Sequence, residues 1–258
     1  MARQKLGQHF LIKGSILERI AAAACPQREP LVIEIGPGKG ALTERLLARA
    51  DRVVAIELDE YLADQLRKKF PDRLEVIEAD VLETDLSQWG PAVVAGNLPY
   101  YISTAILSRV LAPGSVLGRG VFLVQKEVAD RVTACPGSRA YGYLSVESQL
   151  YAEVGTLFDV RPSAFHPPPK VDSALIGFRL RPRELAIDSP DEFLKFVRLC
   201  FRQKRKTIRN NLAAIYGGEA VATLPEAPKR AEQLTVEQFA EMWNKLRFGP
   251  QMNADKRR

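Results

Sequence analysis

Apolar runs of strand length alternate with stretches of helical periodicity through the first half of the chain. The predicted strands cover residues 31–35, 53–57, 74–77, 92–95 and 121–125. The predicted helices cover residues 15–25, 41–50, 61–70, 103–111 and 126–133. Strands that alternate with helices in this way form parallel βαβ units, so we expect an α/β fold whose sheet has helices on both faces.

The pattern changes beyond residue 170. Residues 171–180 alternate loosely and are predicted to add an antiparallel strand at the edge of the sheet. Short helices are then predicted over residues 192–201, 206–216 and 236–246. We therefore expect two domains, an α/β domain of residues 1–182 and a small helical domain of residues 183–258.

The composition is that of a globular protein with an excess of positive charge. Of 258 residues, 46% are hydrophobic and 26% charged, and 37 Lys and Arg against 31 Asp and Glu give a net charge of +6. This excess favours a polyanionic partner such as nucleic acid without requiring one.

Cysteine usage and the N-terminal sequence bear on metals and location. Cys25, Cys135 and Cys200 lie far apart, and no pair has the spacing of metal ligands. We expect no metal and no disulfide framework. The first residues are polar, and the longest apolar run near them, residues 20–25, is too short to span a membrane. A cytoplasmic protein with no membrane partner is the expectation.

A glycine-rich turn, Glu34-Ile35-Gly36-Pro37-Gly38-Lys39-Gly40, joins the first predicted strand to the next helix. Glycines let the backbone turn sharply and approach a ligand closely. A tight turn without a ligand is one interpretation. A dinucleotide site is another, but it needs its third glycine three residues after the second, whereas Gly38 and Gly40 are two apart. Glu34 would repel a pyrophosphate and attract an ammonium group, which favours S-adenosylmethionine.

Acidic residues stand at the ends of the first three predicted strands: Glu34, Glu57 and Asp80. Ligands bind outside the carboxyl ends of the strands in such sheets. Glu57 can accept both hydroxyl protons of a ribose, and Asp80 can accept a hydrogen bond from an adenine amine. Each acid alone is also typical of a solvated strand end, but the three together indicate a cofactor that contains a nucleoside.

The tetrapeptide Asn97-Leu98-Pro99-Tyr100 follows the fourth predicted strand. An aromatic amine such as adenine N6 is a poor nucleophile, because its lone pair is delocalised into the ring. The Asn97 carboxamide oxygen and a backbone carbonyl held out by Pro99 can accept both N6 hydrogens, and Pro99 restricts Leu98 to extended conformations. Tyr100 can stack on an extruded base. By themselves, these four residues also suit an Asn-Pro turn beside a core tyrosine.

Several blocks of sequence are shared with a known family. Besides the glycine turn, the strand-end acids and the tetrapeptide, they are GQHFL (7–11), QKEV (125–128), YGYLSV (141–146), SAFHPPPKVDS (163–173) and RQKRKTIRNNL (202–212). Over residues 7–212 the chain resembles the ribosomal RNA adenine N6,N6-dimethyltransferases, which modify two adjacent adenosines near the 3′ end of small-subunit (16S) ribosomal RNA. The resemblance implies a Rossmann-like S-adenosylmethionine-dependent methyltransferase sheet and a C-terminal helical domain that recognises RNA in small-subunit biogenesis.

The resemblance also assigns residues to the cofactor site. The family's contacts to S-adenosylmethionine carry over to His9, Leu11, Gly36, Glu57, Asp80 and Asn97. His9 stands where many relatives have asparagine. Since both side chains can hydrogen-bond the carboxylate of the cofactor, we expect little change.

The family's catalytic residues carry over to Asn97, Leu98, Pro99 and Tyr100. Tyr101 replaces an asparagine that is common after this motif, which leaves the tetrapeptide intact. Phe165 resembles the aromatic residue that faces Tyr100 across the target base, although an isolated phenylalanine beside a proline-rich turn is more typical of a core.

Five basic residues fall within eight positions: Arg202, Lys204, Arg205, Lys206 and Arg209. Such a charge run is often a solvated helix face. It also suits contacts with phosphates, which supply affinity without base specificity. We expect the partner to be small-subunit ribosomal RNA within the assembling 30S-type subunit, and the protein to be a monomer.

The sequence therefore predicts transfer of methyl groups from S-adenosylmethionine to adenine N6 in small-subunit ribosomal RNA. Three alternatives stay open. They are a methyltransferase of a large-subunit adenine, a DNA adenine methyltransferase, and a ribosome-assembly or transcription factor that keeps the fold for binding alone. The blocks at 163–173 and 202–212 disfavour the first, and no target-recognition domain supports the second. The intact set Glu57, Asp80 and Asn97 disfavours the third.

Overall fold

The computed structural model describes residues 9–111, 117–181 and 185–247. The chain divides into two compact units, one of residues 1–130 with 152–181 and one of residues 131–151 with 182–258. Residues 131–151 thus belong to the second unit, whereas the sequence analysis places them in the first domain. The expected boundary between residues 182 and 183 lies outside the described residues, as do the first two residues of the GQHFL block.

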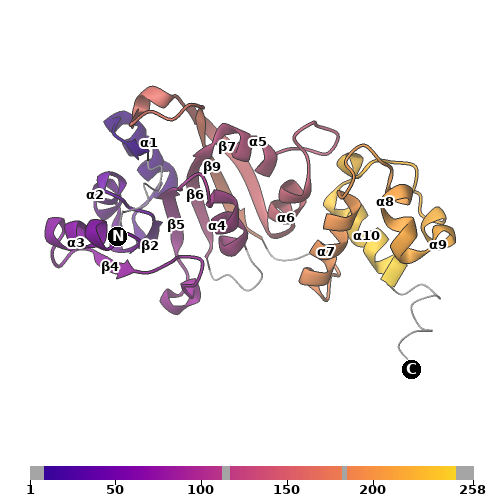
Figure 1. Cartoon of the computed structure of the whole chain (residues 1–258). Helices are drawn as coiled ribbons and strands as arrows, with labels where there is room; N and C mark the ends of the chain where they lie inside the picture. The colour runs from indigo at the N-terminus through magenta and orange to yellow at the C-terminus, as the bar shows by residue number, and fades with distance from the viewer. Residues whose placement is uncertain (1–8, 112–116, 182–184, 248–258) are drawn as a thin grey trace, which may run out of the picture. The chain divides into compact units, whose positions relative to one another are not determined.

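A seven-stranded sheet forms the centre of the first unit (Figure 1). In spatial order its strands are β4 (Glu75–Glu78), β3 (Ala50–Glu57), β2 (Glu29–Ile35), β5 (Val93–Asn97), β6 (Arg119–Gln125), β9 (Ser173–Leu180) and β7 (Ala152–Val160). The strands from β4 to β6 are parallel, and they correspond to the five strands that the sequence predicts. The strand order changes direction between β2 and β5, which is where an open α/β sheet opens a crevice for a ligand.

The antiparallel strand predicted at residues 171–180 is present as β9, but it does not lie at the edge. It pairs with β6 on one side and with β7 on the other. The edge is β7, which the sequence pattern does not predict. Its exposure alternates irregularly, and a bulge interrupts its pairing between Thr156 and Phe158.

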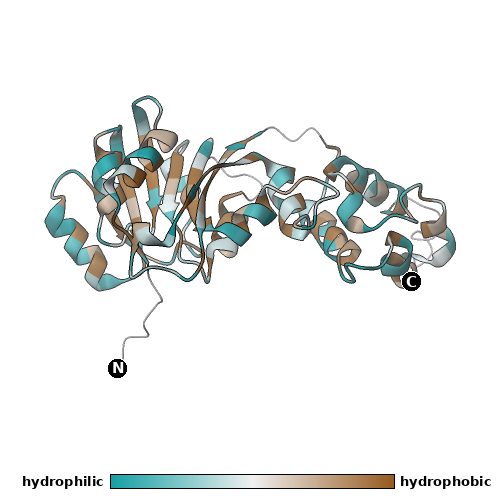
Figure 2. Cartoon of the chain, turned by 90° about the horizontal axis from the view of Figure 1, so that it is seen from above, coloured by the Kyte–Doolittle hydropathy of each residue, from teal (hydrophilic) through white to brown (hydrophobic). Residues whose placement is uncertain are grey.

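Helices cover this sheet as the βαβ pattern predicts. They are α1 (Gly14–Ala24), α2 (Ala41–Leu47), α3 (Glu60–Lys69), α4 (Ser103–Val110) and α5 (Lys126–Val132). Helix α1 packs on β5 and β6, α2 on β3, and α3 on β4 and β3. Central strand residues such as Val32, Val94 and Phe122 have no exposed surface, and the sheet is largely apolar in Figure 2. Parallel strands need this cover on both faces.

A two-stranded antiparallel ladder joins the beginning of the described chain to the proline-rich block. Strand β1 (Phe10–Leu11) pairs with β8 (Phe165–His166), so that Leu11 lies opposite Phe165. The short helix η2 (Pro162–Ala164) precedes β8, and its last carbonyl accepts a hydrogen bond from Ile12 N (2.9 Å). Residues that are far apart in sequence are thereby fixed beside the sheet.

The second unit is helical. It contains α6 (Tyr143–Tyr151), α7 (Pro190–Cys200), α8 (Ile208–Tyr216), α9 (Gly218–Ala222), the short helix η3 (Ala231–Gln233) and α10 (Val236–Arg247). The helices predicted over 192–201, 206–216 and 236–246 are confirmed, whereas α6 and α9 are not predicted. Phe193, Phe196 and Phe239 are buried in its core. None of the described helices is long and apolar enough to cross a membrane.

Candidate active site

A cavity of about 370 Å³ opens at the carboxyl ends of β2, β3 and β5 in the first unit. Its walls include the residues that begin with His9, the glycine turn with the start of α2, Glu57 at the end of β3, and the tetrapeptide after β5. The cavity therefore lies at the point where the strand order changes direction, as expected for a ligand site in this kind of sheet.

The glycine turn and the tetrapeptide lie close together in the wall of this cavity. Gly36 has a φ of +66° and is tied to β3 by a hydrogen bond from its N–H to the Ile56 carbonyl (3.0 Å). A Cβ on Gly36 would lie 3.8 Å from Pro99 Cδ and 3.9 Å from the Asn97 carbonyl oxygen. A Cβ at these distances would make only ordinary van der Waals contacts, so it is the positive φ that favours glycine here.

Glu57 ends β3 with its carboxylate turned to backbone donors. Its oxygens accept hydrogen bonds from Gly38 N and Asp59 N, both at 3.0 Å. Burial raises the pKa of Glu57, although these backbone donors oppose the rise. Each carboxylate oxygen keeps a further lone pair, so the group can still accept the two hydroxyls of a ribose.

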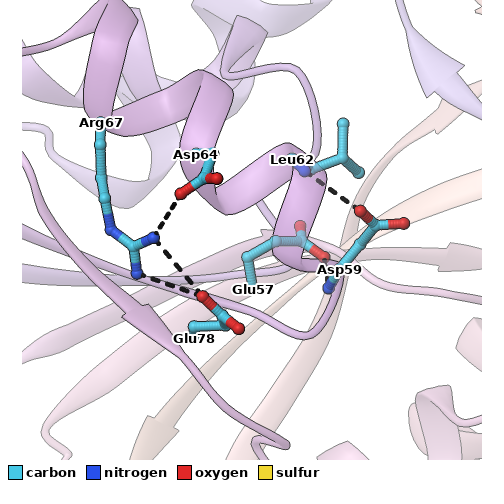
Figure 3. Close-up of polar contacts among 6 residues, drawn as sticks. All are labelled: Glu57, Asp59, Leu62, Asp64, Arg67 and Glu78. Atoms are coloured by element: carbon cyan, nitrogen blue, oxygen red, sulfur yellow. Dashed lines mark hydrogen bonds and ion pairs between the residues drawn. The ribbon is translucent and has the colours of Figure 1, made fainter.

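The acidic side chains around Glu57 are bound to other groups of the protein (Figure 3). Asp59 caps helix α3 by accepting from Leu62 N at 3.1 Å. Glu78, directly opposite Glu57 on β4, is paired with Arg67 at 3.4 Å, and Arg67 also pairs with Asp64 at 2.9 Å. Among the described residues, Glu57 has no such cationic partner, which leaves its charge available to a ligand.

Glu34 lies deeper in the cavity wall and is 1% exposed. Burial raises its pKa to about 8, and the charge of Glu57 adds to the rise. Its Oε2 atom has no hydrogen-bond partner among the described residues. A buried carboxyl group with an open acceptor position suits a cationic ligand group, because pairing would repay the cost of ionising it.

Asn97 has a fixed amide orientation. Its Nδ2 donates to the His9 carbonyl oxygen at 3.0 Å, and since a carbonyl only accepts, the amide oxygen must point the other way. That oxygen, Oδ1, is buried and accepts no hydrogen bond from any described residue. An unpartnered buried acceptor is costly, so its presence at the cavity indicates a ligand that donates.

The rest of the tetrapeptide is held from several sides. Leu98 is buried, and its N–H donates to the Leu123 carbonyl of β6 at 3.1 Å. The Pro99 carbonyl accepts from Ile102 N at 3.2 Å, which closes a turn before α4. The Tyr100 hydroxyl lies 2.6 Å from Ser173 Oγ, and burial raises the pKa of this tyrosine.

His9 connects the tetrapeptide to the proline-rich block. Its Nδ1 lies 2.7 Å from the Pro167 carbonyl and must be the donor. The His9 ring also lies beside the Tyr100 ring, with centroids 5.6 Å apart. Thus one residue orients Asn97 through its main chain and contacts Tyr100 through its side chain.

Not all of the predicted site residues line this cavity. His9, Leu11, Gly36, Glu57 and the tetrapeptide do. Asp80 lies just beyond β4, where its Oδ1 accepts from Leu82 N at 2.8 Å, and it is not among the residues described as lining the cavity. Phe165 is 3% exposed and packs in the hydrophobic core with Leu11 and Leu17. The roles expected for Asp80 and Phe165 stay predictions.

Some residues that line the cavity, or contact a residue that does, are absent from the sequence-based set. Phe10 and Lys39 line the cavity together, with Lys39 Nζ 4.6 Å from the centre of the Phe10 ring. Ser173 reaches Tyr100 from β9. Both Phe10 and Ser173 fall within the shared sequence blocks, but only the fold shows which atoms they meet. Elsewhere too, no cluster of three or more metal-ligating side chains occurs among the described residues.

The basic segment of residues 202–209 lies in the second unit. Its five basic side chains are all exposed: Arg202, Lys204, Arg205, Lys206 and Arg209. Helix α8 begins only at Ile208, so four of the five precede it in a loop. Buried Asn211 holds this loop, because it accepts from Gln203 N (3.0 Å) and donates to the carbonyls of Gln203 and Thr207 (both 3.3 Å).

A second pair of basic residues joins this segment. Thr207 forms a β-bridge with Arg230, and Ile208 N donates to the Lys229 carbonyl at 2.8 Å. Lys229 and Arg230 are exposed as well. The sequence analysis does not include them, because they are separated from the segment by two helices along the chain.

A sheet of this strand order, with a glycine-turn cavity at its switch point and acids at its strand ends, defines a Rossmann-like methyltransferase fold. Within this class, the family model described as ribosomal RNA adenine dimethylase matches residues 1–247, and the chain belongs to this family.

Individual relatives agree. The chain is 45% identical to ribosomal RNA small subunit methyltransferase A of Acidobacterium capsulatum, over 95% of this chain and 91% of the relative. It is 39% identical to the protein of the same name from Koribacter versatilis, over 96% and 95%.

Two solved structures are similar over 92% of this chain. A dimethyladenosine transferase from Plasmodium falciparum has a TM-score of 0.79, 27% identity and 98% of its chain covered. The 23S rRNA methyltransferase ErmE has a TM-score of 0.73, 28% identity and 99% of its chain covered.

Proposed function

We propose that this protein dimethylates the N6 amines of two adjacent adenosines near the 3′ end of small-subunit ribosomal RNA, with S-adenosylmethionine as the methyl donor. The observation that carries the proposal is the buried, unpartnered Oδ1 of Asn97 at the end of β5, which suits an amine that donates hydrogen bonds. Family membership supports adenine as the base that carries this amine.

The choice of RNA follows from the relatives. The two similar solved structures include a 23S rRNA methyltransferase, so the likeness in fold does not separate the two ribosomal subunits. The relatives that are 39–45% identical are named for the small subunit. We therefore assign the small subunit and treat the large-subunit adenine as an outcome of the test.

The residues of the cavity fit the methyl donor. Its donor and acceptor groups match an amino acid joined to a nucleoside: Glu34 for the ammonium group, Glu57 for the ribose hydroxyls, and His9 for the carboxylate. Leu11 and Gly36 line the same cavity, and we assign Asp80 to the adenine amine. When bound, S-adenosylmethionine supplies an electrophilic methyl group; no metal is part of the proposal.

The chain's own residues prepare the nucleophile. Asn97 Oδ1 and the Leu98 carbonyl accept the two N6 hydrogens, which favours a pyramidal nitrogen whose lone pair is no longer shared with the ring. The Pro99 carbonyl already accepts from Ile102, which leaves the Leu98 carbonyl as the better-placed acceptor. Tyr100 stacks on the extruded base, with Phe165 assigned to its other face. Positioning does most of the work, and no strong base is required.

The second unit is assigned to RNA recognition. Its exposed basic segment, extended by Lys229 and Arg230, is suited to phosphates. In this proposal the protein acts as a monomer on the assembling 30S-type subunit in the cytoplasm. The helical domain of residues 183–258 supplies affinity, and the α/β domain of residues 1–182 supplies the reaction.

The decisive experiment incubates the protein with labelled S-adenosylmethionine and unmethylated small subunits, and maps the modified nucleosides by mass spectrometry. We expect dimethyladenosine at two adjacent positions near the 3′ end. Dimethyladenosine in large-subunit RNA instead, or no product, would overturn the proposal.

Asn97→Ala tests whether the buried Oδ1 of Asn97 binds the target amine. It removes the acceptor for N6, so methylation should fall by at least a hundredfold, the order found when one preorganised contact to the reacting group is lost. Affinity for S-adenosylhomocysteine, measured by calorimetry, should change little. Asn97→Asp, which keeps the oxygen but loses the donor to His9, is the matched variant. Full turnover in Asn97→Ala would remove Asn97 from the mechanism.

A further inference from the structure

A buried hydroxyl from β9, two strands away from β5 in the sheet, reaches Tyr100, the tyrosine assigned to base stacking. Ser173 is the first residue of β9 and has no exposed surface, and its Oγ lies 2.6 Å from the Tyr100 hydroxyl. We infer that Ser173 is a positioning residue for methyl transfer, because it holds the Tyr100 ring in the plane on which the target adenine stacks. This inference rests on the proposed function.

The other contacts of Tyr100 leave its ring less constrained. Pro99 fixes the preceding backbone, and Ser103 Oγ donates to the Tyr100 carbonyl at 3.2 Å. Both interactions hold the main chain and leave the two side-chain torsions free. The His9 ring contacts only one side of the Tyr100 ring, at a tilt of 33°. The bond to Ser173 fixes the far end of the ring, where a small rotation moves the stacking plane most.

Ser173 is itself rigid. Its backbone is paired with Gln125 of β6 and Val160 of β7, so it sits between two neighbouring strands. A site built on strands is more precise than a site on loops. Tyr100, in a turn that follows β5, therefore takes its orientation from the sheet, even though 73 residues separate it from Ser173.

The same block of sequence supports the catalytic asparagine. Pro167 accepts from the His9 ring at 2.7 Å, and the His9 carbonyl accepts from Asn97 at 3.0 Å. Residues 165–173 thus support Asn97 through His9 and Tyr100 through Ser173. This gives the proline-rich block a function in orienting the tetrapeptide.

The test compares Ser173→Ala, Tyr100→Phe and the double variant on unmethylated small subunits. Each single variant removes one hydroxyl of the same bond, so we expect each to lower kcat on the order of tenfold through misplacement of the base, with an unchanged KM for S-adenosylmethionine. The double variant should be no worse than either single one, since the two hydroxyls act as one unit. Ser173→Thr, which keeps the hydroxyl, should restore most of the rate.

The matched control is Ser148→Ala. Ser148 is equally buried, but it lies in α6 of the second unit, and its Oγ has no hydrogen-bond partner among the described residues. We expect wild-type kcat in this variant. Losses in Ser173→Ala and Tyr100→Phe that multiply in the double variant would overturn the inference. So would a wild-type kcat in both, or a change confined to KM. If Ser173→Ala does not fold, Tyr100→Phe decides.

A second readout does not depend on turnover. In protein labelled with 3-fluorotyrosine, the ¹⁹F resonance of Tyr100 is identified by its loss in Tyr100→Phe. Ser173→Ala should shift or broaden this resonance, and Ser148→Ala should not. If the wild-type protein fails to methylate small subunits, the proposed function fails, while this spectrum still shows whether Ser173 orders the ring. An unchanged Tyr100 resonance in Ser173→Ala would overturn the inference by itself.

Discussion

Two polar atoms in the cavity wall are buried without a partner among the described residues, namely Glu34 Oε2 and Asn97 Oδ1. Buried polar groups are nearly always hydrogen-bonded, and exceptions gather at functional sites. Here the two atoms have opposite chemical requirements. An ionised Glu34 needs a cation, whereas the amide oxygen of Asn97 needs a neutral donor. Methyl donor and target amine would satisfy one each, so the pair of atoms matches the two substrates.

Glu34 makes the stability of the protein depend on pH. In the unfolded chain its carboxyl group has an ordinary pKa of 4.5, but burial raises the pKa to about 8 in the folded protein, so the proton is kept up to about pH 8. Raising the pH through this window therefore favours the unfolded state, by at most about 1.4 kcal/mol per pH unit. Glu34→Gln, which stays neutral, should be more stable than the wild type at pH 8, by a few kcal/mol, and nearly equal to it at pH 5.

Urea denaturation of both proteins at pH 5, 6, 7 and 8 measures this difference. The comparison isolates Glu34, because Glu57, whose pKa is raised as well, is present in both proteins. Parallel stability profiles would show that Glu34 is ionised throughout, and that its burial is compensated by a contact other than a ligand.

At the residue scale, the sequence predicts part of the cavity wall but not the contacts within it. The chemistry of Asn97 and Glu57 follows from their places at strand ends. The His9 carbonyl that orients Asn97 is 88 residues away. Every residue has a main-chain carbonyl, so the identity of the side chain at position 9 does not reveal that this carbonyl binds Asn97. Ser173 is a similar case, since a serine in a buried strand gives no sign of its partner.

Among the elements, β2 and β5 lie close together at Gly96. A Cβ at this position would lie 2.4 Å from the Ile35 carbonyl oxygen, which belongs to the backbone and cannot easily move. Gly96→Ala should therefore destabilise the protein by about 1–3 kcal/mol, the usual cost of overpacking a core. It should also weaken binding of S-adenosylhomocysteine, because the displaced Ile35 belongs to the glycine turn that lines the cavity.

Gly155→Ala is the control for this substitution. Gly155 also lies in a strand, the edge strand β7, but a Cβ there would have no atom within 4 Å. Alanine should stabilise that position slightly or leave it unchanged. Thermal unfolding of both variants, with and without S-adenosylhomocysteine, checks the contrast. Equal melting temperatures would mean that β2 and β5 can separate at little cost.

The elements that the sequence predicts are those with one clear periodicity. The five parallel strands are continuous apolar runs, and the helices between them are amphipathic. Helix α6 escapes prediction because it buries residues on several sides, including Leu144, Val146 and Ser148. Strand β7 contains a glycine and a bulge, which break its alternation. The β1–β8 ladder has two residues per strand, too few for any pattern.

At the scale of the whole molecule, the two units divide the proposed work. The first unit contains the cavity, the glycine turn and the tetrapeptide. The second contains the basic segment, which is ordered by Asn211 and extended by Lys229 and Arg230. A net charge of +6 on the whole chain says little about where RNA binds. The local cluster says more, because its side chains are exposed and its loop is fixed.

The basic segment should determine how binding depends on salt. Each phosphate neutralised by a Lys or Arg releases counterions, so the slope of log affinity against log salt changes by about 0.7–0.9 per contact. Arg205→Ala and Lys206→Ala should each lower the slope for unmethylated small subunits by about that amount, without changing the positions that are methylated. Filter binding over a range of roughly 50–300 mM KCl measures the slope of log affinity against log salt concentration.

Lys195→Ala separates a specific contact from the loss of a positive charge. Lys195 lies on α7 of the same unit and is exposed, and its Nζ is paired with Glu192 at 2.7 Å. Its removal changes the net charge by the same amount as Lys206→Ala does. If only the overall field of the protein attracts RNA, the three variants should lower the slope equally. If the segment contacts phosphates, Lys195→Ala should keep the wild-type slope. Equal slopes in all three variants would therefore mean that the overall charge of the protein, and not the loop, attracts the RNA.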